Sequence, residues 1–111
     1  MDAPSVGSVV LVRFPFSDLS ASKLRPAIVL ADAGRDDWIL CQITSTPYSD
    51  PRAVPIADCD FAFGSLARTS YARPGKLFAA NTSIMHRVVG RLTSLKHDAV
   101  LDAVVAILRP R

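Results

Sequence analysis

The segment that decides the fold runs from residue 14 to residue 30 and reads FPFSDLSASKLRPAIVL. It begins in one short apolar run, SVVLVRF (8–14), and ends in another, PAIVL (26–30). Both runs are rich in valine and bounded by turn residues, which favours buried strands over helices. The polar stretch between them follows Pro15 and has neither a helical nor a strand period, so we predict a loop there.

Working outward from this segment, we predict a hairpin between residues 26 and 45. Arg25 precedes a proline, which disfavours helical backbone and places it at the start of a strand. AGRDDW (33–38) reads as a turn, and WILCQITS (38–45) as the returning strand. With the turn centred on residue 35, Arg25 lies 10 residues before the centre and Thr44 lies 9 after it. We therefore expect these two residues to lie close together at the open end of the hairpin.

The remaining sequence predicts further short strands and one helix. AVPIA (53–57) contains Pro55, which favours an edge strand. ARTSYA (67–72) and KLFAA (76–80) are two weak strand candidates. Thr93 or Ser94 can cap a helix that continues to Pro110, with a stripe of Leu95, Leu101, Val104, Val105 and Leu108 that we assign to core or dimer packing. The predicted fold is mainly β with a C-terminal helix: five or six strands in a small, curled, mostly antiparallel sheet or barrel, forming one domain over residues 1–111.

Composition narrows the possible functions. Half of the 111 residues are hydrophobic, which is enough for a core, and 13 Lys and Arg against 10 Asp and Glu give a net charge of +3. That balance suits an anionic partner. Cys41 and Cys59 have no metal-ligand spacing, so we expect two buried thiols and no metal site. The N-terminus lacks a targeting pattern and no apolar run is long enough for a membrane span, so we expect a cytoplasmic protein.

Four pieces of the sequence, in this order and spacing, resemble the MazF/PemK family of toxin endoribonucleases. They are GSVVLVRFPFSDLSASKLRPAIVL (7–30), WILCQITS (38–45), GSLARTSYARPGKLFAAN (64–81) and VVGRLTSLKHDAVLDAVVAIL (88–108). The resemblance implies an SH3-like barrel, a homodimer, and sequence-specific cleavage of single-stranded mRNA that needs no metal or other cofactor. It also implies a cognate antitoxin as partner, with DNA bound only indirectly through the antitoxin complex. The loop SDLSASKLR (17–25) is shorter than in many relatives, which leaves the preferred bases open.

The resemblance also assigns site residues. The arginine of its Arg-Pro step is Arg25, and the threonine at the end of its third strand is Thr44; both are catalytic positions. Ser20, Ser22 and Lys23 fall in its substrate loop, and Ser70 and Lys76 in its RNA-binding groove. Arginine carries five donors that match phosphate oxygens, which suits it to stabilise charge in the transition state. The threonine hydroxyl can donate to the same phosphate. Phe16, Tyr48 and Tyr71 are candidate platforms for base stacking.

Other interpretations of the same residues stay open. Arg25 could pair with Asp18 or Asp36, and the serines could serve only as turn formers. We assign no acid–base role to His86, which we place in a connection, or to His97, which we expect to be exposed in the first helical turn. The alternative function is a barrel without catalysis, either a gyrase-directed toxin or a module that binds nucleic acid or protein.

Overall fold

The structure is a computed structural model that describes residues 3–14, 23–46 and 49–110, with the backbone alone for Phe14 and Lys23. The described elements are β1 (Ser8–Phe14), β2 (Lys23–Gly34), β3 (Asp37–Thr44), β4 (Val54–Ile56), η1 (Asp58–Asp60), β5 (Phe61–Gly64), β6 (Ser70–Asn81), η2 (Thr82–Ile84), β7 (Met85–Leu92) and α1 (Ser94–Leu108). The loop after β1, with Ser20 and Ser22, lies outside the described residues.

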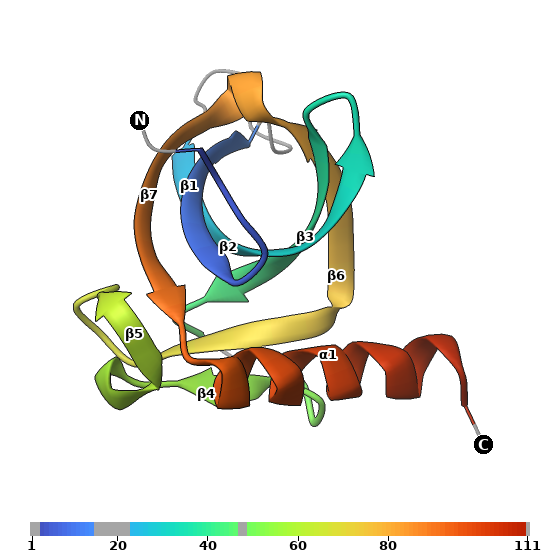
Figure 1. The fold of residues 1–111 in the computed structure, drawn as a ribbon. Coiled ribbons are helices and arrows are strands. Elements are labelled where there is room, and N and C mark those ends of the chain that lie inside the picture. Colours follow the sequence, from blue (N-terminus) through green and yellow to red (C-terminus); the bar gives the residue numbers. More distant parts are fainter. Residues whose placement is uncertain (1–2, 15–22, 47–48, 111) are drawn as a thin grey trace.

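All seven strands belong to one sheet, in the order β4-β6-β3-β2-β1-β7-β5. Every neighbouring pair is antiparallel. Strands β7, β1, β2 and β3 and the later part of β6 curl into an almost closed ring, and α1 runs beneath it beside β4 and the start of β6, which pairs with β4 (Figure 1). The predicted mainly β fold with one C-terminal helix is confirmed, and so is the edge position of the strand that contains Pro55.

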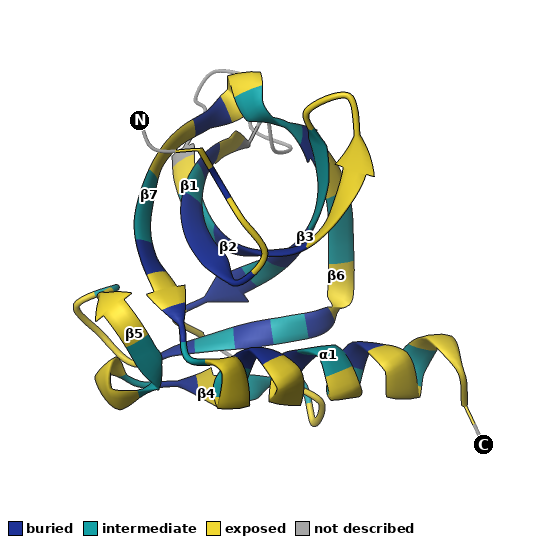
Figure 2. Ribbon diagram, in the orientation of Figure 1, coloured by how far each residue is buried: buried dark blue, intermediate teal, exposed yellow. Residues whose placement is uncertain are grey.

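Buried side chains form two hydrophobic clusters on opposite faces of the sheet. The helix-side cluster includes Ile28 and Leu30 of β2 together with Val100 and Val104 of α1. The barrel cluster lies on the inner face of the ring and draws only on strands, with Ala27 and Val29 of β2 among its members. Because successive side chains of a strand point to opposite faces, β2 serves both clusters at once and is buried on each side (Figure 2).

The predicted hairpin joins β2 and β3 through Arg35 and Asp36. Both residues have positive φ, 55° and 64°, as a type I′ turn requires. The Asp32 carboxylate accepts a hydrogen bond from the Gly34 N–H at 2.7 Å, which fixes the strand end before the turn. The turn therefore lies where the sequence predicted it.

β6 replaces the two weak strands that the sequence predicted. Its pairing with β3 passes from Cys41 opposite Leu77 directly to Ile43 opposite Ala72, so four residues of β6 face a single residue of β3. These residues, 73–76 with the sequence RPGK, form a sharp bend, and the two legs of β6 run in different directions (Figure 1). The Cys41 thiol donates to the Arg73 carbonyl oxygen at 3.2 Å and so holds the bend against β3. The proline and glycine marked a break in pairing and not an end of the strand.

The helix begins as predicted, with Thr93 as its N-cap. The Thr93 hydroxyl accepts a hydrogen bond from the Lys96 N–H at 3.2 Å. Val100 and Val104 are buried against the sheet. Three members of the predicted apolar stripe, Leu95, Val105 and Leu108, are instead exposed in the single chain.

Two strands and one cysteine differ from the sequence prediction. β5 and β7 were not predicted as strands, because β7 is interrupted by charged residues and Gly90, and β5 is only four residues long. Cys41 is buried as expected, but Cys59 is exposed, since it lies in the η1 turn outside both clusters. None of the described helices combines the length and the apolar character that crossing a membrane demands.

We predict that Gly64→Ala destabilises the fold far more than Gly34→Ala. Both glycines have positive φ, 78° and 88°. A Cβ on Gly64 would lie 2.1 Å from the Val89 carbonyl oxygen, whereas a Cβ on Gly34 meets nothing within 4 Å. The shared backbone strain costs about 1–2 kcal/mol, and displacing β7 adds about 1–3 kcal/mol at Gly64 alone. Urea unfolding of the two variants measures the difference; equal losses would contradict the close packing of β5 on β7.

Candidate active site

Arg25 lies near the start of β2, on the inner face of the ring. Its cross-strand partner on β1 is Val12, which is buried in the barrel cluster. Cross-strand partners point to the same side of a sheet, so Arg25 continues the row formed by Ala27 and Val29. The side chain is half-buried, and its Nε atom is buried. A guanidinium in this position stays charged while much of its stem is packed.

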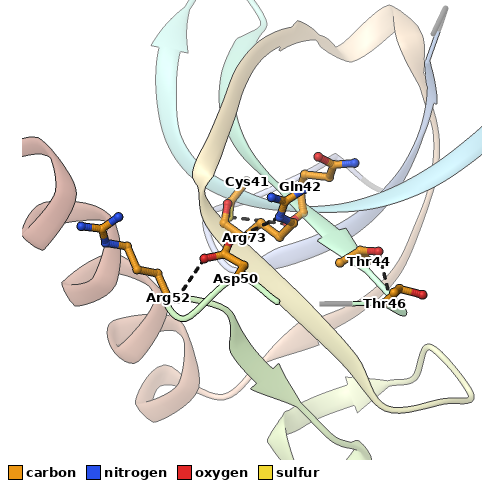
Figure 3. Close-up of polar contacts among 7 residues, drawn as sticks. All are labelled: Cys41, Gln42, Thr44, Thr46, Asp50, Arg52 and Arg73. Carbon is orange, nitrogen blue, oxygen red and sulfur yellow. Dashed lines mark hydrogen bonds and ion pairs between the residues drawn. The ribbon is translucent and has the colours of Figure 1, made fainter. Parts of the chain in front are cut away.

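Thr44 is the last residue of β3 and is 7% exposed. Its Oγ1 accepts a hydrogen bond from the Thr46 N–H at 3.1 Å, which fixes the side chain as the chain leaves the strand (Figure 3). On the other side of β3 its partner is Tyr71 of β6, a half-buried aromatic residue. Every second residue of a strand points to the same face, so Thr44 shares a face with Gln42 and Leu40. Leu40 belongs to the barrel cluster, so Thr44 also faces the inside of the ring.

The pairing of β2 with β3 relates these two residues. Ala27 lies opposite Gln42, Ile28 opposite Cys41 and Val29 opposite Leu40, so each pair of numbers sums to 69. Extending that register by two residues along each strand sets Arg25 opposite Thr44, because 25 and 44 also sum to 69. Both side chains then face the same side of the sheet at its open end.

Two irregularities in this ladder produce that register. At the turn, Gly34 pairs with Asp37, a sum of 71, which continued unbroken would set Arg25 opposite Thr46. The pairing shifts once between Asp32 and Gly34, and again between Val29 and Ala31. Each shift inserts one extra residue in β2, as a β-bulge does. Together they move Arg25 from the level of Thr46 to that of Thr44.

An ion pair adjoins this end of β3. The Arg73 Nε lies 3.3 Å from Asp50 Oδ2, and both side chains are about four-fifths buried, at 21% and 17% exposure. The Arg52 N–H donates to Asp50 Oδ1 at 2.9 Å (Figure 3). That backbone N–H, followed by the Arg73 side chain, holds the pKa of Asp50 below its usual value even though partial burial raises it. Sequence reasoning missed this pair, since 23 residues separate its members.

Three of the five predicted RNA-binding residues fall within the described part of the chain, on β2 and β6. Ser70 is buried, pairs with Ile56 of β4 and donates to the Arg68 carbonyl oxygen at 3.2 Å. Lys76 is exposed in the bend of β6. Lys23 lies on β2 opposite Phe14, two residues from Arg25. Ser20, Ser22, Phe16 and Tyr48 lie outside the described residues, so their roles stay predictions.

The two histidines differ from expectation. His86 lies on strand β7 and not in a connection, and it is exposed. His97 was expected to be exposed but is buried, with 8% of its surface accessible, because residues around Gly7 pack over the start of α1. Burial lowers the pKa of His97; nearby Asp98 opposes that change and Arg91 adds to it.

Neither a metal cluster nor an activated thiol accompanies the site in the described ranges. Residues 3–14, 23–46 and 49–110 contain no group of three His, Cys, Asp or Glu side chains that could hold a metal ion. Burial raises the pKa of the Cys41 thiol to about 12, so this cysteine stays protonated near neutral pH. The guanidinium of Arg25 and the hydroxyl of Thr44 are hydrogen-bond donors that suit recognition of an anionic group.

Comparison with known families supports the reading of the sequence. Residues 5–108 match the family of PemK-like, MazF-like toxins of type II toxin–antitoxin systems. The chain belongs to this family. A comparison with curated proteins finds no match.

Solved structures share the fold of this toxin at low sequence identity. An endoribonuclease from a mycobacterial species, solved with its cognate antitoxin, aligns with a TM-score of 0.73 and 15% identity over 97% of this chain and 95% of that one. MazF from Deinococcus radiodurans aligns at 0.75 and 17% over 97% and 98%. The Mycobacterium tuberculosis toxin MazF-mt6 aligns at 0.70 and 16% over 91% and 95%. The predicted family and barrel fold are therefore confirmed.

We predict that burial of His97 makes stability depend on pH. The unfolded chain takes up a proton near the ordinary histidine pKa of about 6.5, whereas the folded chain resists protonation. The free energy of unfolding should therefore fall as the pH drops below about 6.5. His97→Gln should remove that part of the pH dependence, and His86→Gln should retain it. Urea unfolding between pH 5 and 8 at constant ionic strength measures this; an unchanged slope in His97→Gln would contradict it.

Proposed function

We propose that this toxin is an endoribonuclease that cleaves single-stranded RNA at short specific sequences, with Arg25 and Thr44 at the reacting phosphate. The observation that supports the proposal is the β2–β3 register, which is observed as far as Ala27 opposite Gln42. From its extension by two residues on each strand we infer that Arg25 and Thr44 lie side by side at the open end of the hairpin. The printed descriptions of similar structures as endoribonucleases support it. A protein that only bound nucleic acid would not need the Arg25 guanidinium beside the Thr44 hydroxyl.

The chemistry is a transesterification within the RNA. The 2′-oxygen attacks the adjacent phosphorus while the bond to the 5′-oxygen breaks, which leaves a 2′,3′-cyclic phosphate and a 5′-hydroxyl. Since the nucleophile is part of the substrate, the reaction needs charge stabilisation and proton transfer more than it needs a metal. Arg25 is always protonated, and its N–H donors stabilise the charge that builds on the phosphate oxygens.

Thr44 supplies a second donor. Because its oxygen already accepts the Thr46 N–H, the position of the hydroxyl is fixed and its own proton can be donated to a phosphate oxygen. Asp50 is a poor candidate for the proton acceptor, since its lowered pKa keeps it a weak base. Tyr71, opposite Thr44, is placed to stack on a base next to the cleaved phosphate.

We further propose that the toxin is a homodimer and is held inactive by a cognate antitoxin. One structure with the same fold was solved with such a partner. The net charge of +3 favours an acidic partner segment, and the same charge attracts RNA. A segment that covered Arg25 would compete directly with the substrate. DNA contact is then left to the antitoxin in the complex.

We predict that Arg25→Ala abolishes cleavage without unfolding the protein. Purified protein is incubated with mixed-sequence single-stranded RNA in EDTA, and the product ends are mapped. Loss of the charge and its donors should lower the rate by more than about 10³-fold, while Arg25→Lys, which keeps the charge but not the fork, should retain part of it. Arg109→Ala is the matched control, since it removes an equal charge from the exposed end of α1. Full activity of Arg25→Ala, or intact RNA with the unmodified protein, would overturn the proposal and favour the binding-only alternative.

We predict that Thr44→Val lowers the cleavage rate by about 10²- to 10³-fold. Valine keeps the shape of the side chain, so the change isolates the hydroxyl. Thr44→Ser restores that hydroxyl and should recover most of the rate. Single-turnover assays separate the effect on the chemical step from RNA binding. If Thr44→Val cleaves as fast as Thr44→Ser, the hydroxyl takes no part in the reaction.

A further inference from the structure

A polar pocket lies at the N-terminal end of α1, away from Arg25 and Thr44. It has a volume of about 220 Å³ and includes Gly7, Arg91, Ser94, His97 and Asp98 in its lining. Arg91 pairs with Ser8 at the start of β1, whereas Arg25 pairs with Val12 near its end. Four residues of strand separate the two levels by about 13 Å.

His97 shows that this pocket is built for a polar occupant. The side chain is 8% exposed and lines the pocket, yet in the described part of the chain neither Nδ1 nor Nε2 has a hydrogen-bond partner. Buried polar groups are nearly always hydrogen-bonded. An acceptor oxygen in the pocket would satisfy the protonated nitrogen of this ring.

Gly7 lies beside both Arg91 and His97 and has no side chain between them. A Cβ on Gly7 would lie 3.7 Å from Arg91 Nε and 3.9 Å from His97 Nδ1, so both nitrogens lie within 4 Å of one point. Gly7 cannot move aside, because its N–H donates to the Val29 carbonyl oxygen at 2.9 Å and its carbonyl accepts from the Leu92 N–H at 3.0 Å. Arg91 Nε and His97 Nδ1 therefore approach each other over the face of Gly7 that carries no side chain.

The charges around the pocket favour an anion. Arg91 contributes a guanidinium from β7, and Ser94 contributes a hydroxyl at the start of the 15-residue helix, where the first N–H groups have no partner within the helix. Lys96 is engaged elsewhere, with its Nζ 3.7 Å from Asp60 Oδ2. Asp98 is the one acidic side chain of the described pocket lining and opposes an anion.

We propose that this pocket binds a phosphate group, either as inorganic phosphate or as the terminal phosphate of a nucleotide or RNA end. Arg91 and the start of α1 hold its charge, and His97 contacts its oxygens over Gly7. The groups that face His97 are Asp98 on its own helix, Arg91 on β7 and Gly7 on the N-terminal segment. Binding of a dianion raises the pKa of His97, which burial otherwise lowers. The proposal stands independently of the ribonuclease function.

The test uses the two histidines of the chain as internal probes. Inorganic phosphate is titrated into the full-length protein while the ring signals of His97 and His86 are followed by NMR, with chloride at equal ionic strength as the reference. Saturable movement of the His97 signals, with His86 unmoved, is the expected result. An unmoved His97, or equal movement in chloride, would overturn the proposal. Adenosine monophosphate and a short 5′-phosphorylated RNA, each beside its unphosphorylated form, then show which source of phosphate binds best.

Variants sharpen the assignment because they shift affinity in opposite directions. Arg91→Ala should weaken phosphate binding by about tenfold or more, and Asp98→Asn should strengthen it. His97→Phe keeps a ring of similar size, removes both nitrogens and should also weaken binding, which fluorescence or calorimetric titration can follow. Arg25→Ala, which should abolish cleavage, should leave phosphate affinity unchanged, so failure of this site is distinguishable from failure of the ribonuclease proposal. Phosphate affinity that is indifferent to all three changes would place the anion elsewhere.

Discussion

Strand β2 is the element on which the rest of the molecule depends. Its residues Ala27 to Leu30 are all buried, alternately in the barrel cluster and in the helix-side cluster. A strand that serves two cores cannot slip by one residue, because a slip would exchange the side chains of the two faces. Packing on both sides therefore sets the position of the other residues of β2, including Arg25.

The candidate active site lies where this constraint ends. Beyond the last β2–β3 pair, Ala27 and Gln42, β2 continues to Arg25, which lies opposite Val12 of β1, and β3 continues to Thr44. The guanidinium of Arg25 is thus held by strands that are packed on both faces, and both proposed catalytic residues lie at the border of the packed region. Such an arrangement meets the need of catalysis for donors that are already in place before the transition state forms.

Local patterns predicted the parts of the fold that local chemistry controls. The hairpin at Arg35 and Asp36 and the cap at Thr93 follow from residues close in sequence, and both were predicted correctly. Features that depend on distant packing were not: nothing near His97 in the sequence indicates that the segment around Gly7 covers it.

The candidate site, like the fold, was predictable from sequence only where residues close in sequence determine it. Counting from the turn predicted that Arg25 and Thr44 lie near each other. The observed register, which ends at Ala27 and Gln42, depends on two bulges that no residue pattern indicated. The assignment of Arg25 and Thr44 to catalysis came from family resemblance and not from periodicity. The Arg73–Asp50 ion pair and the pocket beside α1 join residues from separate elements, so they emerged only from the folded chain.

The open sheet has a consequence for how the free protein behaves at high concentration. A ring that does not close leaves two terminal strands, β4 and β5, whose backbone groups could pair with another molecule. Both are short, with three and four residues, and each carries a residue that limits pairing: Pro55 has no N–H to donate, and Gly64 turns the chain at positive φ. Edges this short and interrupted limit the pairing of strands between copies of the chain.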